Sequence, residues 1–98
     1  MRIVARSTLK KYAARHADAK ISLDGWYDVV HKARWSTLQD VVATFGKRIS
    51  ILPRNRVVFD IGGNNYRLVA VVLCRRKAVY VRFIGTHAEY DKIDAVTI

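Results

Sequence analysis

The second half of the chain contains three short runs of residues, at 56–61, 66–74 and 78–84, that are rich in β-branched and aromatic side chains. Such composition is typical of β-strands. Only short turns, at 62–65 and 75–77, connect the runs. Strands connected in this way must be antiparallel, because a parallel pair needs a crossover of about a dozen residues or more. The chain is therefore predicted to contain an antiparallel sheet.

The two turns set the register of the predicted strands. The first turn consists of Gly and Asn, which accept positive φ easily, and it aligns Asp60 with Arg67. The second turn aligns Val69 with Arg82, and Arg67 then lies opposite Ile84. We therefore expect Arg67 and Arg82 to be diagonal neighbours, with backbones about 7–8 Å apart.

This register divides the side chains of the sheet between two faces. One face is apolar throughout and must be covered by helices: Val57, Phe59, Ile61, Tyr66, Leu68, Ala70, Val72, Val79, Val81 and Phe83. The other face is apolar with three arginines and one aspartate set into it: Arg56, Val58, Asp60, Arg67, Val69, Val71, Leu73, Tyr80, Arg82 and Ile84. A slip of one residue would mix the two sets, and this supports the register.

The first half of the chain has helical rather than strand periodicity. Apolar residues recur with helical spacing over 9–13 and again over 19–30. A third helix is expected over 37–45, where Ser36 and Gln39 have the spacing of a capping box. These segments supply the apolar helix faces that the sheet requires.

Residues 1–98 are expected to form a single domain, because a chain of 98 residues supports one hydrophobic core. The predicted fold class is α+β, with N-terminal helices packed on one face of a small twisted antiparallel sheet and a short C-terminal helix. Residues 2–5 are expected to add an edge strand. Residues 46–56 contain the only proline and several basic residues, and they are expected to form a connector.

The net charge of +10 comes from 18 Lys and Arg residues against 8 Asp and Glu residues. This charge predicts a polyanionic partner, and it favours a nucleic acid over a membrane surface. A single cysteine excludes an internal disulfide, and no Cys or His pattern suits a structural zinc ion. The longest apolar run, 68–74, is far shorter than the ~20 residues that cross a bilayer, and we find no signal peptide. We expect a cytoplasmic protein that binds no membrane.

The side chains best suited to chemistry follow the third predicted strand. Thr86 begins a capping-box pattern, which predicts a short helix. That helix carries His87 and Tyr90 on one face. If it folds back over the arginine face of the sheet, His87 and Tyr90 converge with Arg67 and Arg82 on one shallow polar pocket.

These residue types suit the cleavage of RNA without a metal ion. Two guanidinium groups clamp a phosphate, a histidine titrates near neutral pH, and a tyrosine stacks on a base or transfers a proton. No cluster of carboxylates is available to hold Mg²⁺, and no cofactor is called for. A base would remove the proton of a 2′-OH, which attacks the adjacent phosphorus while the arginines stabilise the developing charge.

Structural interpretations of the same residues stay open. Arg67 is equally suited to an ion pair with Asp60 across the strands, Glu89 suits a helix cap better than a general base, and Cys74 suits a packed thiol. The residues alone also leave simple RNA binding open. The basic side chains expected to contact RNA are Arg54, Arg56, Arg75, Arg76, Lys77 and Lys92.

Two stretches, FDIGGNNYRLVAVV and YVRFIGTHAEYDKIDA, closely resemble the HigB-type toxins of bacterial type II toxin–antitoxin modules, which belong to the RelE-like superfamily of messenger-RNA interferases. The resemblance extends to RWSTLQDVVATFG and to residues 53–56, so it covers most of the chain. By this resemblance, the catalytic positions are Arg67, Arg82, His87 and Tyr90.

The resemblance implies a toxin that cuts mRNA, typically in the ribosomal A site, and that is silenced by a HigA-type helix-turn-helix antitoxin. Operator DNA would be bound only through the complex with that antitoxin. Two alternatives remain at this point: a non-catalytic module that binds RNA or the ribosome, and a protein that serves chiefly as a co-repressor with its antitoxin.

Overall fold

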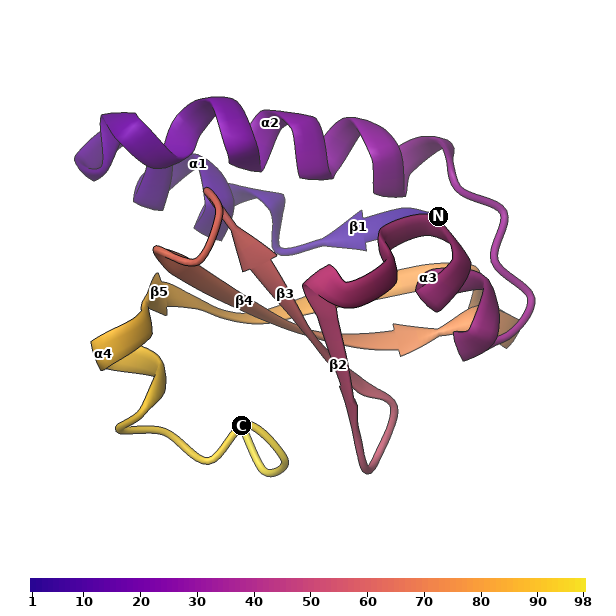
Figure 1. Cartoon of the computed structure of the whole chain (residues 1–98). Helices are drawn as coiled ribbons and strands as arrows, with labels where there is room; N and C mark the ends of the chain where they lie inside the picture. The colour runs from indigo at the N-terminus through magenta and orange to yellow at the C-terminus, as the bar shows by residue number, and fades with distance from the viewer.

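The computed structural model describes all 98 residues and confirms the α+β class. A five-stranded sheet, in the order β1-β5-β4-β3-β2, has helices α1 and α2 on one face, while α4 and the C-terminal segment lie on the other (Figure 1). No helix has both the length and the apolar character that crossing a membrane requires. The elements are β1 (Arg2–Val4), α1 (Arg6–Arg15), α2 (Ala17–Lys32), α3 (Leu38–Phe45), a 3-10 turn (Gly46–Arg48), β2 (Ile49–Leu52), β3 (Arg56–Ile61), β4 (Tyr66–Leu73), a second 3-10 turn (Cys74–Arg76), β5 (Ala78–Thr86) and α4 (His87–Tyr90).

The helices pack on the apolar sheet face as the periodicity predicts. The buried residues of α2 are Ala19, Leu23, Trp26 and Val30, which have helical spacing. The rings of Trp26 on α2 and Phe45 on α3 both meet the ring of Phe59 on β3 edge-on, with centroids 5.4 and 5.0 Å apart. The main core therefore lies between the helices and the sheet, and it leaves the second sheet face available.

A β-bulge in β5 corrects the predicted register of the last two strands. The pairing of β3 with β4 is as predicted, and β4 pairs with β5 as predicted as far as Ala70 and Val81. Beyond this point the partner of Val69 is Phe83, so Arg82 is the extra residue of the bulge. An extra residue reverses which face the following side chains occupy.

Two predicted strand pairings and two predicted face assignments are consequently wrong. Arg82 does not lie opposite Val69, and Arg67 lies opposite Gly85 instead of Ile84. Ile84 joins the core under the helices. Phe83 packs on the second face, in a small cluster around Val58, Val69 and Ala95.

The expected connector at 46–56 is only partly a connector, because Ile49–Leu52 forms strand β2 and pairs with β3. Pro53 follows the strand in a turn where Arg54 and Asn55 have positive φ, so the proline does not interrupt the pairing. The edge strand expected over 2–5 is confirmed as β1, which runs parallel to β5.

The cap of α3 lies one residue later than predicted. Thr37 is the N-cap and Asp40 the third helical residue, whereas Ser36 and Gln39 were expected. The Asp40 carboxylate accepts hydrogen bonds from the main-chain N–H groups of Ser36 and Thr37, at 2.7 and 3.1 Å. These two donors lower the pKa of Asp40.

Candidate active site

Helix α4 begins where the sequence predicts, at a capping box. The Thr86 hydroxyl accepts a hydrogen bond from the Glu89 N–H at 3.2 Å, and the Glu89 carboxylate accepts one from the Thr86 N–H at 2.8 Å. The Thr86 N–H lowers the pKa of Glu89. Glu89 therefore acts as a cap, in agreement with the structural interpretation of this residue.

An aromatic cluster that the sequence did not reveal joins α1 to α4. The Tyr12 hydroxyl donates to the Glu89 carboxylate at 3.4 Å. Its ring stacks on His16 with centroids 4.1 Å apart and meets Tyr66 edge-on at 5.9 Å. Burial and the nearby charge of Glu89 raise the pKa of Tyr12 to about 12. The helical layer thus helps to fix the position of α4.

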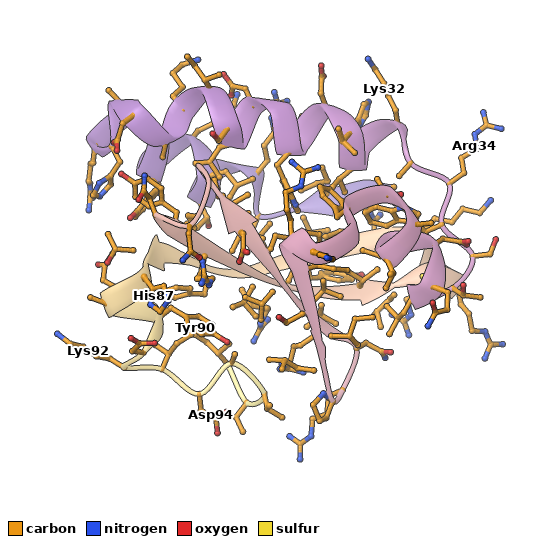
Figure 2. All side chains as sticks on the ribbon, viewed as in Figure 1. Lys32, Arg34, His87, Tyr90, Lys92 and Asp94 are labelled. Carbon is orange, nitrogen blue, oxygen red and sulfur yellow. The ribbon has the colours of Figure 1, made fainter.

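His87 and Tyr90 extend from α4, on the side of the sheet opposite to α2 (Figure 2). The His87 main-chain N–H donates to the Asn65 carbonyl at 3.2 Å, which ties α4 to the β3–β4 turn. The His87 Nδ1 lies 3.4 Å from a carboxylate oxygen of Asp91. Tyr90 packs near the Phe83 ring, with centroids 6.4 Å apart.

Arg67 forms the cross-strand ion pair that the sequence left open. Its Nη1 lies 3.1 Å from Oδ1 of Asp60, and only 14% of the Arg67 side chain is exposed. Arg82, in contrast, is exposed, and its Nε donates to the main-chain oxygen of Ile98 at 3.3 Å. The two arginines therefore contact different partners.

Arg56 was expected only as one of several basic residues that contact RNA, but in the structure it contacts the same atom as Arg82. Its Nη2 donates to the main-chain oxygen of Ile98 at 2.6 Å, and its Nη1 donates to the Arg54 carbonyl at 3.3 Å. Arg56 and Arg82 thus converge on one oxygen atom, whereas the sequence predicted that Arg67 and Arg82 would converge.

The other residues expected to contact RNA lie at two ends of the sheet. Arg54 occupies the β2–β3 turn, and Arg75, Arg76 and Lys77 occupy the β4–β5 turn, all exposed. Strand β5 has 9 residues, so roughly 30 Å separates the β4–β5 turn from α4 at about 3.3 Å per residue. Lys92 is exposed just after α4 (Figure 2).

Cys74 does not have the properties of a nucleophile. Its side chain is half-buried against the main core, and burial raises the pKa of its thiol. The prediction of a packed thiol is confirmed. No group of three or more His, Cys, Asp or Glu residues is arranged to hold a metal ion.

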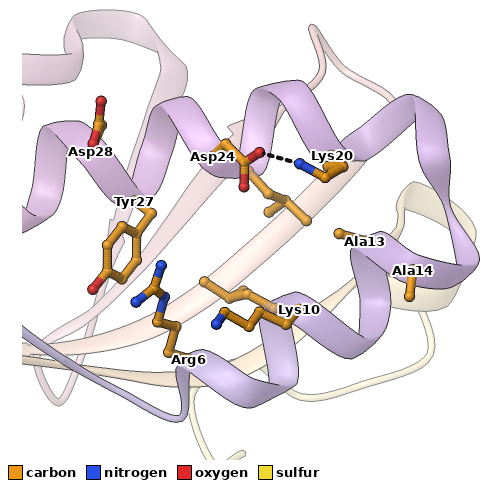
Figure 3. Close-up of a pocket in the computed structure, with 10 residues that line it drawn as sticks. Arg6, Lys10, Ala13, Ala14, Lys20, Asp24, Tyr27 and Asp28 are labelled. Carbon is orange, nitrogen blue, oxygen red and sulfur yellow. Dashed lines mark hydrogen bonds and ion pairs between the residues drawn. The ribbon is translucent and has the colours of Figure 1, made fainter.

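A groove of about 610 Å³ lies between α1 and α2, and it contains none of the predicted site residues (Figure 3). The ion pair between Lys20 and Asp24, at 2.7 Å, lines one side. On the other side the Arg6 guanidinium lies 4.1 Å from the ring centroid of Tyr27. No sequence pattern indicates this groove, because it depends on how two helices pack against each other.

Comparison with known proteins gives consistent matches across the chain. The family model HigB_toxin, described as the RelE-like toxic component of a toxin-antitoxin system, matches residues 19–93. The mRNA interferase HigB of Escherichia coli O6:H1 is 30% identical over 94 residues, which are 95% of this chain and 91% of that protein. The mRNA interferase toxin HigB of Escherichia coli K12 is 29% identical over 98 residues, which are 98% of this chain and 93% of that protein.

These matches define the class of protein as the toxic component of a toxin–antitoxin system, and such a system implies an antitoxin partner. Within that class, the chain belongs to the HigB family of RelE-like toxins. The resemblance noted in the sequence is thereby confirmed.

Proposed function

We propose that this chain is an mRNA interferase that cleaves RNA through attack of a ribose 2′-OH on the adjacent phosphorus, without a metal ion. The observation that carries the proposal is the second sheet face: β3, β4 and β5 carry Arg56, Arg67 and Arg82, and α4, with its histidine and tyrosine, follows the end of β5. The two relatives that match nearly the full chain are mRNA interferases. A HigA-type antitoxin and the ribosome are the proposed protein and ribonucleoprotein partners, in the cytoplasm.

Each side chain has a proposed role in the reaction. Arg67 and Arg82 stabilise the negative charge that develops on the phosphoryl oxygens, which is worth about 2.7–4 kcal/mol for a comparable oxyanion donor. His87 is an exposed side chain next to the Asp91 carboxylate, and it transfers a proton during the attack. Tyr90 lies beside Phe83, where its ring can stack on a base.

The remaining basic residues support binding. Arg54, Arg75, Arg76 and Lys77 are exposed at the end of the sheet far from α4. They are proposed to contact phosphates of the mRNA or the ribosome and to contribute affinity without taking part in the chemical step. The Arg67–Asp60 ion pair is compatible with catalysis, because it holds the guanidinium in one place before RNA binds.

The chemistry of the new RNA ends tests the proposal. Purified protein is added to translating ribosomes, and the cleaved mRNA is mapped and its ends are characterised. Attack by the 2′-OH breaks the bond between phosphorus and the 5′ oxygen of the next nucleotide, so one fragment ends in a 2′,3′-cyclic phosphate and the other begins with a 5′-hydroxyl. A single 2′-deoxy nucleotide at the cleavage position should block the cut. Short free RNA in EDTA tests whether a metal ion is needed.

Variants connect the reaction to the site. Arg67→Ala, Arg82→Ala and His87→Gln should each lower cleavage strongly while the protein stays folded. Arg6→Ala, on the helical layer over Tyr27, is the control that removes an arginine without touching the sheet face. Ribosome binding without any cut would favour the non-catalytic alternative. Full activity of all three site variants would place the active site elsewhere.

A further inference from the structure

A pocket of about 340 Å³ lies between α1 and the part of β5 that follows Tyr80. Strand β1 pairs only with the first three residues of β5, so that edge of β5 has no partner strand beyond Tyr80. Helix α1 forms the other wall of the pocket. The lining residues are 82–84 of β5 and, from α1, Thr8, Lys11, Tyr12 and Arg15. The pocket thus includes Arg82 of the proposed active site, together with α1 residues that have no role so far.

The pocket has an unbalanced positive charge. Lys11, Arg15 and Arg82 each contribute a cation, and no Asp or Glu is among the lining residues. Lys11 and Arg15 are exposed, and neither forms an ion pair. The two residues are four apart on α1, a spacing at which like charges destabilise a helix. This arrangement is unfavourable in the protein alone, and an anion in the pocket would relieve it.

The other side of α1 provides a contrast within the same helix. Arg6 and Lys10 are also four residues apart, and they line the groove between α1 and α2 (Figure 3). That groove contains two carboxylates, Asp24 and Asp28, against three cations. The Arg6 guanidinium also lies over the ring of Tyr27. The positive charge is therefore largely offset on the groove side of α1 and not on the pocket side.

We propose that Lys11 and Arg15 bind one phosphate of the RNA strand that Arg82 contacts, so that the strand crosses the unpaired edge of β5 and continues onto α1. This inference rests on the proposed function, because it extends the path of the same strand. Lys and Arg are the side chains that neutralise backbone phosphates, and the Thr8 hydroxyl is a further donor of a kind that contacts phosphate oxygens. The occupant is the substrate mRNA, because the pocket shares Arg82 with the proposed active site.

One phosphate contact has a defined effect on RNA affinity. For a single strand, each contact adds about 0.7 to the slope of log K against log salt. Between 1 M and 0.1 M salt, such a contact therefore strengthens binding about fivefold. A phosphate contact carries no sequence information, so the effect should be the same for probes of different sequence.

The probe is a fluorescent eight-nucleotide RNA with 2′-O-methyl groups, which cannot undergo 2′-OH attack. Its Kd is measured by anisotropy between 0.1 and 1 M salt. The pocket variant, Lys11→Gln with Arg15→Gln, should bind about fivefold more weakly than the parent at about 0.1 M salt, with a slope reduced by about 0.7. Urea unfolding confirms that the fold is retained.

The groove variant, Arg6→Gln with Lys10→Gln, is the matched control. It removes the same two charges, at the same spacing, from exposed positions of the same helix. A helix with its side chains is about 10–12 Å across, and charges are screened over about 10 Å at 0.1 M salt. The groove variant should therefore bind the probe like the parent. Equal losses in both variants would show that net charge alone acts, and would overturn the site.

A second experiment distinguishes mRNA from ribosomal RNA as the source of the phosphate. The pocket and groove variants should bind equally well to ribosomes that carry no mRNA. Weaker binding of the pocket variant to these ribosomes, with parent-like binding of the probe, would assign Lys11 and Arg15 to ribosomal RNA and overturn the inference. Parent-like probe binding with weaker binding of a poly-glutamate peptide would assign the pocket to an acidic protein, and would also overturn it.

The outcomes separate this inference from the proposed function, because the probe is not cleaved. The expected loss of slope in the pocket variant, together with intact mRNA on ribosomes that carry the parent protein, would sustain this inference and refute the proposed function. Cleaved mRNA together with an unchanged slope would do the reverse.

Discussion

Replacing Gly85 with alanine tests how closely β5 and α4 are packed. A Cβ at this position would lie 2.5 Å from Cζ of Phe83 and 3.1 Å from a carboxylate oxygen of Glu89. Carbon atoms in contact are normally about 3.5–4.0 Å apart, so the Phe83 ring must shift by about 1 Å, away from its place beside Tyr90. Overpacking of this kind costs roughly 1–3 kcal/mol, and each kcal/mol lowers the Tm of a domain of this size by about 4–8 °C.

Urea and thermal unfolding, followed by circular dichroism, measure this effect. Gly25→Ala is the matched control: nothing lies within 4 Å of a Cβ at Gly25 in α2, so that variant should be stabilised by about 0.5–1 kcal/mol. Phe83→Leu shortens the clashing side chain, so the double variant with Gly85→Ala should lose less stability than the sum of the single variants. A Gly85→Ala protein as stable as the parent, or strictly additive losses, would refute the steric argument.

Three further predictions concern the helix caps and the basic turn. Thr86→Ala should lower the free energy of unfolding by about 0.5–2 kcal/mol through loss of the cap, while Thr86→Ser should keep most of it; urea titrations compare the two. Main-chain donors lower the pKa values of the Asp40 and Glu89 carboxyl groups in the folded state. The two carboxylates therefore stabilise the fold fully above their ordinary pKa, which is near 4. This stabilisation is lost as the pH falls through the lower pKa values of the folded state. Unfolding of Glu89→Gln should accordingly depend less on pH between about 6 and 3. Charge reversal across 75–77 should weaken RNA binding and flatten its salt dependence, yet leave the single-turnover cleavage rate at saturating RNA unchanged; a fall in that rate would show that the turn belongs to the active site.

Local sequence was sufficient to predict the pairing of β3 with β4. The turn between them is made of Gly and Asn, and Gly62 and Gly63 both adopt the positive φ that was expected. The alternation of side chains then determines the register over the whole strand pair. The α4 cap at Thr86 was equally predictable, because a capping box lies within four consecutive residues.

The bulge at Arg82 could not be predicted in the same way. Val81, Arg82 and Phe83 continue the alternation of a regular strand, and no local residue marks the point where one of them leaves the pairing. The extra residue only becomes apparent when Phe83 is found on the second face with Tyr90. A regular register would make Arg67 and Arg82 diagonal neighbours. The bulge breaks that register, so the expectation is wrong.

Contacts between distant parts of the chain also could not be predicted from the sequence. Tyr12 meets Glu89, and Arg56 meets Ile98, although the residues of each pair are far apart in the chain. These contacts result from packing of whole layers, and no spacing rule describes them. They nevertheless determine how α4 is held and which arginines converge, so the sequence indicates candidate residues for the site but not the partners that those residues contact.

The parallel pairing of β1 with β5 has a consequence for the time at which the toxin becomes complete. Arg2 pairs with Ala78 and Val4 with Tyr80, so one of the first segments to be synthesised must wait for one of the last. At about 5–20 residues per second, roughly 4–15 s pass between the synthesis of the two partners. Pairing of such high contact order also forms slowly. During its own translation, the nascent chain therefore cannot complete the sheet that carries Arg56, Arg67 and Arg82 until β5 has been made.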